Sequence, residues 1–265
     1  IKLDKARLGD KRFKKILAFF KITPQKINLT KGKVWPSKGL ILLAGNLKPK
    51  SGEYQIKFKG EELQAEDLLS KHLMGLLQLS GSLAGFLPKV NDVPELSDYS
   101  RDLSGDIKIK LTDGAIPKLG MLENFLTLLN PNTALNAQKE GLSYDYLGGN
   151  FKIVKGVVHT NNFEVKSPQI NLTVTGKADL VKDTVLAQVK AMPLQMLDKT
   201  IKAIPLLGAI LGGGKKGGVI ETYFKMYGKL SQPEFTMEAH KTLTEKPGSI
   251  LKGLLNLPKN LTEGK

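Results

Sequence analysis

The sequence predicts a mainly β fold of the α+β class, an antiparallel meander of strands with a few short flanking helices. The clearest strand signal lies in 168–176, where Ile170, Leu172 and Val174 alternate strictly with polar residues. Similar segments recur along the chain, and glycine, proline, asparagine and aspartate stand between them, as in the turns of a meander. Only 6% of the residues are aromatic, so the core must be aliphatic.

The composition limits the classes of protein to which the chain can belong. A chain of 265 residues with 41% hydrophobic residues can bury a sizeable core in one or two domains. It has no cysteine, which excludes disulfide bonds and thiolate metal sites. No segment reaches the roughly 18 uninterrupted apolar residues of a transmembrane helix. No signal peptide is recognisable, and the chain starts with Ile1, so we expect a piece of a longer protein whose membrane anchor lies elsewhere.

The formal net charge of +15 fits a lysine-rich solvated surface, a nucleic-acid partner or an anionic lipid surface. Most lysines alternate with apolar residues inside strands, as in 54–59 and 107–111, so they are spread along exposed strand faces. Arginine, which recognises phosphate and bases better than lysine, occurs only at Arg7, Arg12 and Arg101. We therefore expect no nucleic-acid partner.

The first element is expected to be a basic amphipathic helix over 10–21, within an N-terminal segment of residues 1–24. At helical spacing Phe13, Ile16, Leu17 and Phe20 share one face, and lysines cover the rest. Such a helix either caps one end of the domain or lies on an anionic membrane surface through these four residues. Residues 25–265 form the β domain.

The β domain begins with short strands between Gln25 and Phe58, and Gly32, Pro36–Gly39 and Pro49–Gly52 are expected to form their turns. One or two helical turns follow in 61–70, then a strand over 73–83. A short helix over 93–99 precedes a strand that ends in the Asp113–Gly114 turn.

The second half of the chain is expected to continue the meander. The strongest helix of the first 130 residues is predicted over 119–129 and ends before Pro131. Strand segments are expected at 150–154, 157–158, 162–165, 168–176 and 183–191. A helix with Pro193 in its first turn runs to Ile204 and leads into the apolar loop 205–214. Strands at 219–228 and 234–239 and a helix near 249–257 end the pattern.

No arrangement of residues in the sequence predicts catalysis. His72, His159 and His240 stand far apart, without partners at metal-ligand spacing. The segment 81–85 lacks the glycine that a nucleophile elbow needs two places before Ser82. The glycine-rich loop 208–218 does not match a phosphate-binding loop, and Asp102, Asp106 and Asp113 fit strand ends and turns. We expect no enzyme activity, metal or cofactor.

From Leu103 onward, the order of signals resembles the C-terminal domain of the AsmA-like envelope proteins, the group that includes AsmA, YhdP and TamB. The resemblance covers roughly residues 73–260 and is weaker before them. The segments that carry it are Leu103–Gly114, the leucine-rich helix through Leu129–Asn130, Phe151–Val158, Ile170–Leu180, Met192–Asp198, Ile204–Gly213 and Tyr227–Pro233.

The resemblance implies an elongated, curved antiparallel sheet that forms a groove with an apolar interior. It also implies anchorage in the inner membrane of a double-membraned bacterium, a periplasmic location and a role in moving phospholipid toward the outer membrane. This chain lacks the N-terminal anchor and most of the length that spans the periplasm, so it would be one part of such a bridge.

Two function classes follow for the apolar strand faces. The first is non-enzymatic binding and transfer of phospholipid, with acyl chains in the groove. The second is a structural or assembly role in which the apolar face or a sheet edge receives a protein partner; a membrane surface and other envelope proteins are further candidate partners. The sequence leaves open whether the apolar faces close on one another as a β-sandwich. The predicted groove-lining residues are Ile107, Ile109, Leu111, Phe151, Ile153, Phe163, Val165, Ile170, Leu172, Val174, Val185, Ala187 and Val189.

Overall fold

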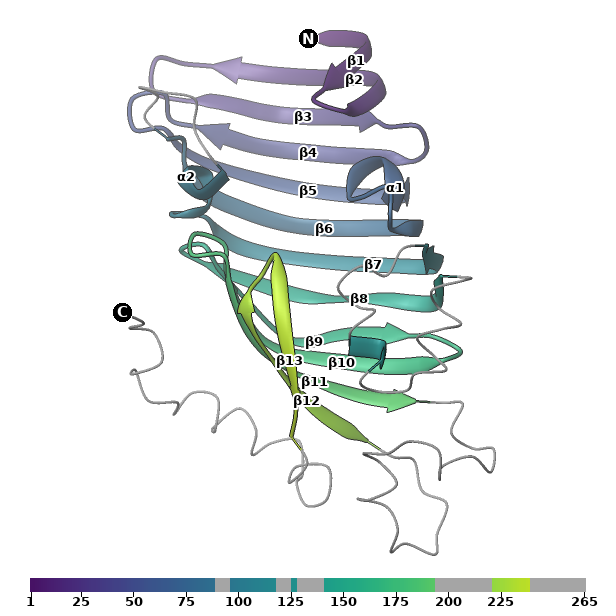
Figure 1. Cartoon of the computed structure of the whole chain (residues 1–265). Helices are drawn as coiled ribbons and strands as arrows, with labels where there is room; N and C mark the ends of the chain where they lie inside the picture. Colours follow the sequence, from purple (N-terminus) through teal and green to yellow (C-terminus); the bar gives the residue numbers. More distant parts are fainter. Residues whose placement is uncertain (89–95, 118–124, 128–140, 194–220, 239–265) are drawn as a thin grey trace, which may run out of the picture.

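In the computed structural model, one antiparallel sheet of thirteen strands, each paired with its neighbours in sequence order, dominates the described residues (Figure 1). The structure describes residues 1–88, 96–117, 125–127, 141–193 and 221–238. The predicted mainly β, antiparallel meander is confirmed, and no second sheet packs against the first within these residues.

The strands are long and are joined mostly by short turns. Their bounds are β1 Lys2–Leu8, β2 Lys11–Ile22, β3 Ile27–Trp35, β4 Leu40–Leu47, β5 Glu53–Gln64, β6 Met74–Phe86, β7 Ser104–Ile116, β8 Leu142–Val154, β9 Val157–Lys166, β10 Ile170–Asp179, β11 Thr184–Pro193, β12 Thr222–Lys229 and β13 Gln232–Met237. The helices are α1 Ala65–Leu68 and α2 Leu96–Ser100, and residues 125–127 are also helical. Figure 1 shows the strand direction turning steadily from β3 to β13, as the twist of neighbouring strands requires.

From β3 to β13 the register places apolar side chains on one side of the sheet. Residues that stand opposite each other in neighbouring strands point to the same face. One such row runs from β3 to β8 through Val34, Ile41, Gly60, Leu79, Ile109 and Gly149. We call this side the inner face. Followed from β3 to β13, its paired positions carry apolar residues and glycine, with a few threonine and tyrosine residues and no charged side chain.

The opposite side, the outer face, carries polar and charged residues. A row one residue away runs through Lys33, Leu42, Lys59, Ser80, Lys108 and Asn150. This alternation explains why the lysines are spread along the chain in sequence and yet leave the inner face free of charge.

Glycines on the inner face let neighbouring groups approach the backbone closely. A Cβ atom at Gly81 would lie 2.9 Å from the Phe58 ring and 2.3 Å from the Asp106 carbonyl oxygen. Gly32, predicted as a turn residue, instead lies inside β3, where its Cβ would lie 2.9 Å from that of Leu43. These glycines make room for large side chains of the next strand on a strongly curved sheet.

Most buried side chains belong to the strands from β5 onward. Leu77, Leu111, Tyr144 and Phe224 are among the fully buried residues. From β1 to β4, among the described residues, the one buried hydrophobic side chain is that of Val34, which is 9% exposed. Phe125 and Leu126 pack onto the inner face and join the same cluster. The inner face is therefore covered toward β12 and more open toward β3.

The N-terminal expectation of a helix over 10–21 is wrong, since Lys11–Ile22 forms β2 between β1 and β3. Apolar residues at both odd and even positions produced the helical spacing. Pairing with two neighbouring strands satisfies the backbone of the segment along its length instead.

Other predicted helices were placed only partly correctly. The helix expected in 61–70 is limited to α1, because Glu61–Gln64 continue β5. The helix expected over 93–99 is α2 at Leu96–Ser100. Met192 and Pro193, expected to begin a helix, end β11.

Several predicted elements lie wholly or partly outside the described residues. Of the helix over 119–129, only residues 125–127 are described, and they are helical. The helices over 194–204 and 249–257, and the apolar loop 205–214, fall outside. The strand predicted over 73–83 is confirmed as β6, and those at 219–228 and 234–239 correspond to β12 and β13.

Candidate functional site: the apolar inner face

The thirteen residues predicted to line a groove all lie on the inner face. Ile107 stands opposite Phe151, and Leu111 stands opposite Leu147, which stands opposite Val165. The row continues from Val165 through Leu172 to Ala191. The other predicted residues occupy equivalent positions in the same ladders, so the structure brings the predicted set together on one surface.

These residues differ in how far they are covered. Leu111, Ile170 and Leu172 are buried, as are Ile153, Val165, Val185, Ala187 and Val189. Ile107, Ile109, Phe151, Phe163 and Val174 are half-buried. The predicted set is therefore part covered core and part accessible groove wall.

A cavity of about 350 Å³ adjoins the covered part of the inner face. Eight of the predicted residues line it, from Phe151 on β8 to Val189 on β11. Phe125 also lines it, with its ring centroid 5.1 Å from that of Phe224 and 4.8 Å from that of Phe235. The volume is at the lower end of the range for small-molecule sites in proteins.

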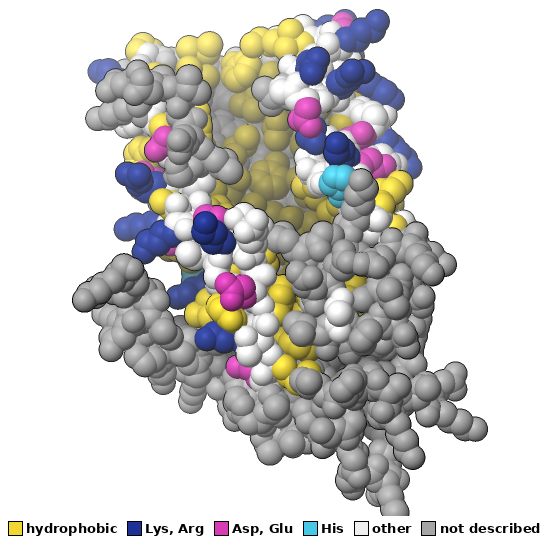
Figure 2. Space-filling model, in the orientation of Figure 1, with side chains coloured by type: hydrophobic (Ala, Val, Ile, Leu, Met, Phe, Trp, Pro, Cys, Tyr) yellow, Lys and Arg dark blue, Asp and Glu magenta, His cyan; other side chains and the backbone are white. Residues whose placement is uncertain are grey.

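The inner face of the first strands is open. Figure 2 shows the upper part of the molecule as a hollow lined by hydrophobic side chains, with lysines and arginines along its margins. Leu43, Ile56, Phe58 and Leu83 belong to this side of β4, β5 and β6, and all are half-buried. A surface of this composition is suited to an apolar ligand.

The residues predicted from the sequence did not include the open inner face of β4–β6. They also did not include the aromatic residues Phe224 and Phe235 next to Phe125. Ile56 and Phe58 alternate with polar residues as clearly as the predicted residues of β7 do, so the signal was present in the sequence. Phe224 and Phe235 gave no such signal, because their approach to Phe125 depends on how the sheet curves.

The four residues proposed to contact a membrane do not share one face. Because β2 is a strand, Phe13 and Leu17 point to one side and Ile16 and Phe20 to the other. Ile16 and Phe20 stand opposite Val34 and Leu29, which places them on the inner face. The geometric basis of the predicted contact is therefore lost, and contact of these residues with a membrane stays a prediction.

Two buried tyrosines lie on opposite faces of the sheet: Tyr144 belongs to the core cluster, and Tyr223 stands opposite Lys190 on the outer face. The Tyr144 hydroxyl donates a hydrogen bond to the Met74 carbonyl oxygen. Burial first, and repulsion from Glu66 second, raise the pKa of Tyr144 to about 12. Burial, with a hydrogen bond of 2.9 Å from the Tyr223 hydroxyl to Glu221, raises the pKa of Tyr223 to about 12 as well. Both phenols are therefore neutral at physiological pH.

In the described part of the chain, His, Asp and Glu residues form no group that could hold a metal ion. His72 and His159 are exposed on the surface, and His240 lies outside the described residues. No helix in that part is long and apolar enough to cross a membrane.

The chain matches the family model described as YhdP protein over residues 5–235, which is most of its length and almost the whole sheet. No curated protein and no solved structure matches it.

Proposed function

Because the chain belongs to the YhdP family of AsmA-like envelope proteins, we propose that its inner face carries the acyl chains of phospholipids between the two membranes of a bacterial envelope. The proposed action is non-enzymatic, and its setting is the periplasm, as part of a protein anchored in the inner membrane. The observation that carries the proposal is an inner face without a charged side chain from β3 to β13.

The energetics of acyl transfer support this reading. Each methylene gains about 0.8 kcal/mol when it leaves water for an apolar surface. A chain of about sixteen carbons therefore needs on the order of 12 kcal/mol of apolar contact outside a bilayer. A continuous aliphatic face supplies such contact at each step. Because no polar group on it binds one lipid position in preference to another, barriers to sliding are low.

The open part of the inner face fits the needs of a headgroup. Leu43, Ile56, Phe58 and Leu83 of this part are half-buried, and charged residues lie at its margins (Figure 2). Acyl chains lying in this hollow would leave their headgroups at the open side, in contact with water. That arrangement avoids the cost of burying a charged phosphate.

One observation favours the second candidate function, a binding site for a protein partner. In the described sheet β1 and β13 each pair with one neighbour only, so each has a backbone edge without a strand beside it. Such edges accept an added strand. In that case the inner face would be covered by protein and would hold no lipid.

Mass spectrometry of the purified protein separates the two candidates. We expect phospholipid to co-purify with the chain at a fixed ratio after gentle extraction. Lipid-free protein that forms a stable complex with another envelope protein would instead support the second candidate and contradict the first.

A further inference from the structure

A second cavity, of about 710 Å³, opens on the outer face where β7, β8, β9 and β10 bend. We call it the outer cleft. Its polar lining includes Lys108, Asn150, Lys152, His159, Asn161 and Lys177. It opens on the other side of the sheet from the inner face, although two of its polar residues, Thr160 and Lys177, border the inner cavity as well.

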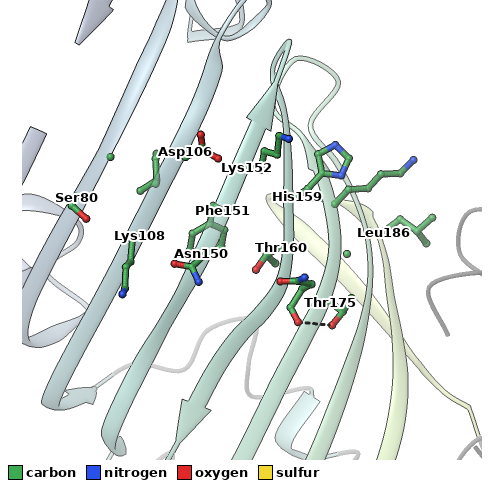
Figure 3. Close-up of a pocket in the computed structure, with 15 residues that line it drawn as sticks. Ser80, Asp106, Lys108, Asn150, Phe151, Lys152, His159, Thr160, Thr175 and Leu186 are labelled. Atoms are coloured by element: carbon green, nitrogen blue, oxygen red, sulfur yellow. Dashed lines mark hydrogen bonds between the residues drawn. The ribbon is translucent and has the colours of Figure 1, made fainter. Parts of the chain in front are cut away.

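A break in the ladder between β8 and β9 creates the bend. Regular pairing stops at Gly148 with Glu164 and resumes at Lys152 with His159, so residues 149–151 stand opposite residues 160–163. The Asn150 amide instead donates to the Asn162 side-chain oxygen at 2.9 Å. The Thr175 hydroxyl donates to the Asn161 carbonyl at 3.4 Å, a bond drawn in Figure 3. An extra residue of this kind bends a strand and increases its twist.

Beside the bend, three basic side chains stand in one row. Lys152 pairs with His159, and His159 pairs with Lys177, across three adjacent strands. Figure 3 shows Lys152 and His159 side by side. All three side chains are exposed. Lys152 and Lys177 are both cationic and lie on the two strands that flank His159, so an anion held between them would be attracted by both charges.

None of these three residues forms an ion pair within the described part of the chain. Asp106 is the register partner of Lys152 but stays outside ion-pair distance. Two acidic residues of the nearby β10–β11 turn have other partners. Asp179 accepts the Val181 and Lys182 amides at 3.0 Å. Asp183 accepts the Ser231 hydroxyl at 2.7 Å.

The cleft also has an apolar wall. Leu186 is half-buried on the outer face and stands opposite Lys177, and Ile107 and Phe151 add to the lining. Four of the lining residues, Phe151, Thr160, Gly176 and Lys177, also border the inner cavity. A site with both features recognises an anionic amphiphile rather than an anion alone.

We propose that the outer cleft binds a phospholipid with an anionic headgroup. Its phosphate lies against Lys152, His159 and Lys177, and its apolar part lies against Leu186. Lysine binds phosphate as a point charge, and charge-assisted hydrogen bonds are stronger than neutral ones. The inference does not depend on acyl transport along the inner face, because the residues that carry it point to the other side of the sheet.

Calorimetric titration of the whole chain with three probes tests the proposal. The probes are dihexanoyl phosphatidic acid, dihexanoyl phosphatidylcholine and inorganic phosphate. We expect the phosphatidic acid to bind most tightly. Equal affinity for inorganic phosphate would make the cleft a site for the free ion and overturn the lipid assignment. Equal affinity for the zwitterionic lipid would show that charge is not recognised and would overturn it too.

A matched pair of double variants assigns the binding to the cleft. Lys152→Gln with Lys177→Gln removes two charges from the row, and we expect the affinity for phosphatidic acid to fall about tenfold. Lys57→Gln with Lys110→Gln removes two exposed charges elsewhere on the outer face, and the affinity should change less than about twofold. Both double variants must have wild-type melting curves. If they lose the same affinity for phosphatidic acid, the binding depends on net charge alone, and the assignment to the outer cleft is contradicted.

Discussion

The Phe125 ring meets the Phe224 ring edge-on, at 5.1 Å between centroids and 76° between planes. Phe125 comes from outside the sheet, whereas Phe224 lies on the inner face of β12. This contact covers the inner face near its C-terminal end, while Leu43, Ile56, Phe58 and Leu83 on the inner face of β4–β6 are half-buried. The apolar surface thus has a covered part and an open part, and the two should respond differently to substitution.

Phe125→Ala should both destabilise the fold and enlarge the inner cavity. Phe125 is 1% exposed, and truncation of a buried phenylalanine costs about 3–5 kcal/mol of unfolding free energy. Urea unfolding measures the loss. As a control, Phe86→Ala removes a ring that is 47% exposed and should cost less than about 1 kcal/mol. Similar losses in the two variants would mean that Phe125 does not cover the core.

In the open part, Phe58→Glu should prevent lipid binding. A carboxylate placed on this face loses hydration when an acyl chain covers it, which costs several kcal/mol, and about 1.4 kcal/mol already lowers an affinity tenfold. The matched control is Gln55→Glu, which adds the same charge to the exposed outer side of the same strand. In protein that also carries Lys152→Gln and Lys177→Gln, so that the outer cleft binds little lipid, the lipid per protein counted by mass spectrometry should fall at least about tenfold in the first variant only.

Both variants must be folded for this comparison, which circular dichroism and thermal melting establish. If folded Phe58→Glu retains wild-type lipid, the open part of the inner face is not the path.

Gly81→Ala tests whether glycines on the inner face permit the curvature of the sheet. The added Cβ would lie 2.3 Å from the Asp106 carbonyl oxygen, which belongs to the neighbouring backbone and cannot move freely. We expect a loss of about 1–3 kcal/mol in thermal or urea unfolding. Ser82→Ala, one residue along the same strand on the outer face, should change the stability by less than about 0.5 kcal/mol. An unchanged Gly81→Ala melting temperature would contradict the close-approach argument.

Alkaline pH should destabilise the protein through Tyr144. Its pKa is raised from 10.0 to about 12, chiefly by burial, so the folded state keeps a proton that the unfolded chain has lost. The stabilising contribution is complete below the unfolded pKa of 10.0 and is lost as the pH rises through about 12. Urea unfolding across this range should show a steeper loss in the wild-type protein than in Tyr144→Phe.

The same variant has an expected effect at neutral pH. Without the Tyr144 hydroxyl, the Met74 carbonyl loses its hydrogen-bond donor, which costs about 1 kcal/mol. Parallel stability curves for the two proteins at alkaline pH would show that Tyr144 does not titrate with a raised pKa.

The sequence predicted the class of fold and one side of the sheet because both follow from a period of two. Ile170, Leu172 and Val174 alternate with polar residues without interruption, so a register that buries one of them buries all three. Their partners, such as Val165 and Phe163 in β9 and Val189 in β11, also alternate with polar residues. The family resemblance supplied the groove. The resemblance also implied one elongated, curved antiparallel sheet, which the structure has, but neither source gave the length of the strands.

The failures have identifiable physical causes. In β2, Ile16, Leu17, Phe19 and Phe20 put apolar side chains on both faces of the strand, and helical spacing fits that pattern equally well. The outer cleft depends on the extra residue near Asn161 and Asn162, which no periodic pattern marks. Pairing of Lys152 with His159 and Lys177 likewise requires the register of three strands.

Site-specific photo-crosslinking of labelled phospholipid tests the central claim most directly. A photoreactive residue at Ile56 and one at Val174 report on the open and covered parts of the inner face. Probes at Lys57 and Thr173 report on the outer side of the same strands, away from the row of basic residues. We predict strong labelling at Ile56, weaker labelling at Val174 and background labelling at Lys57 and Thr173. Equal labelling at Ile56 and Lys57 in folded protein would contradict an acyl path confined to the inner face.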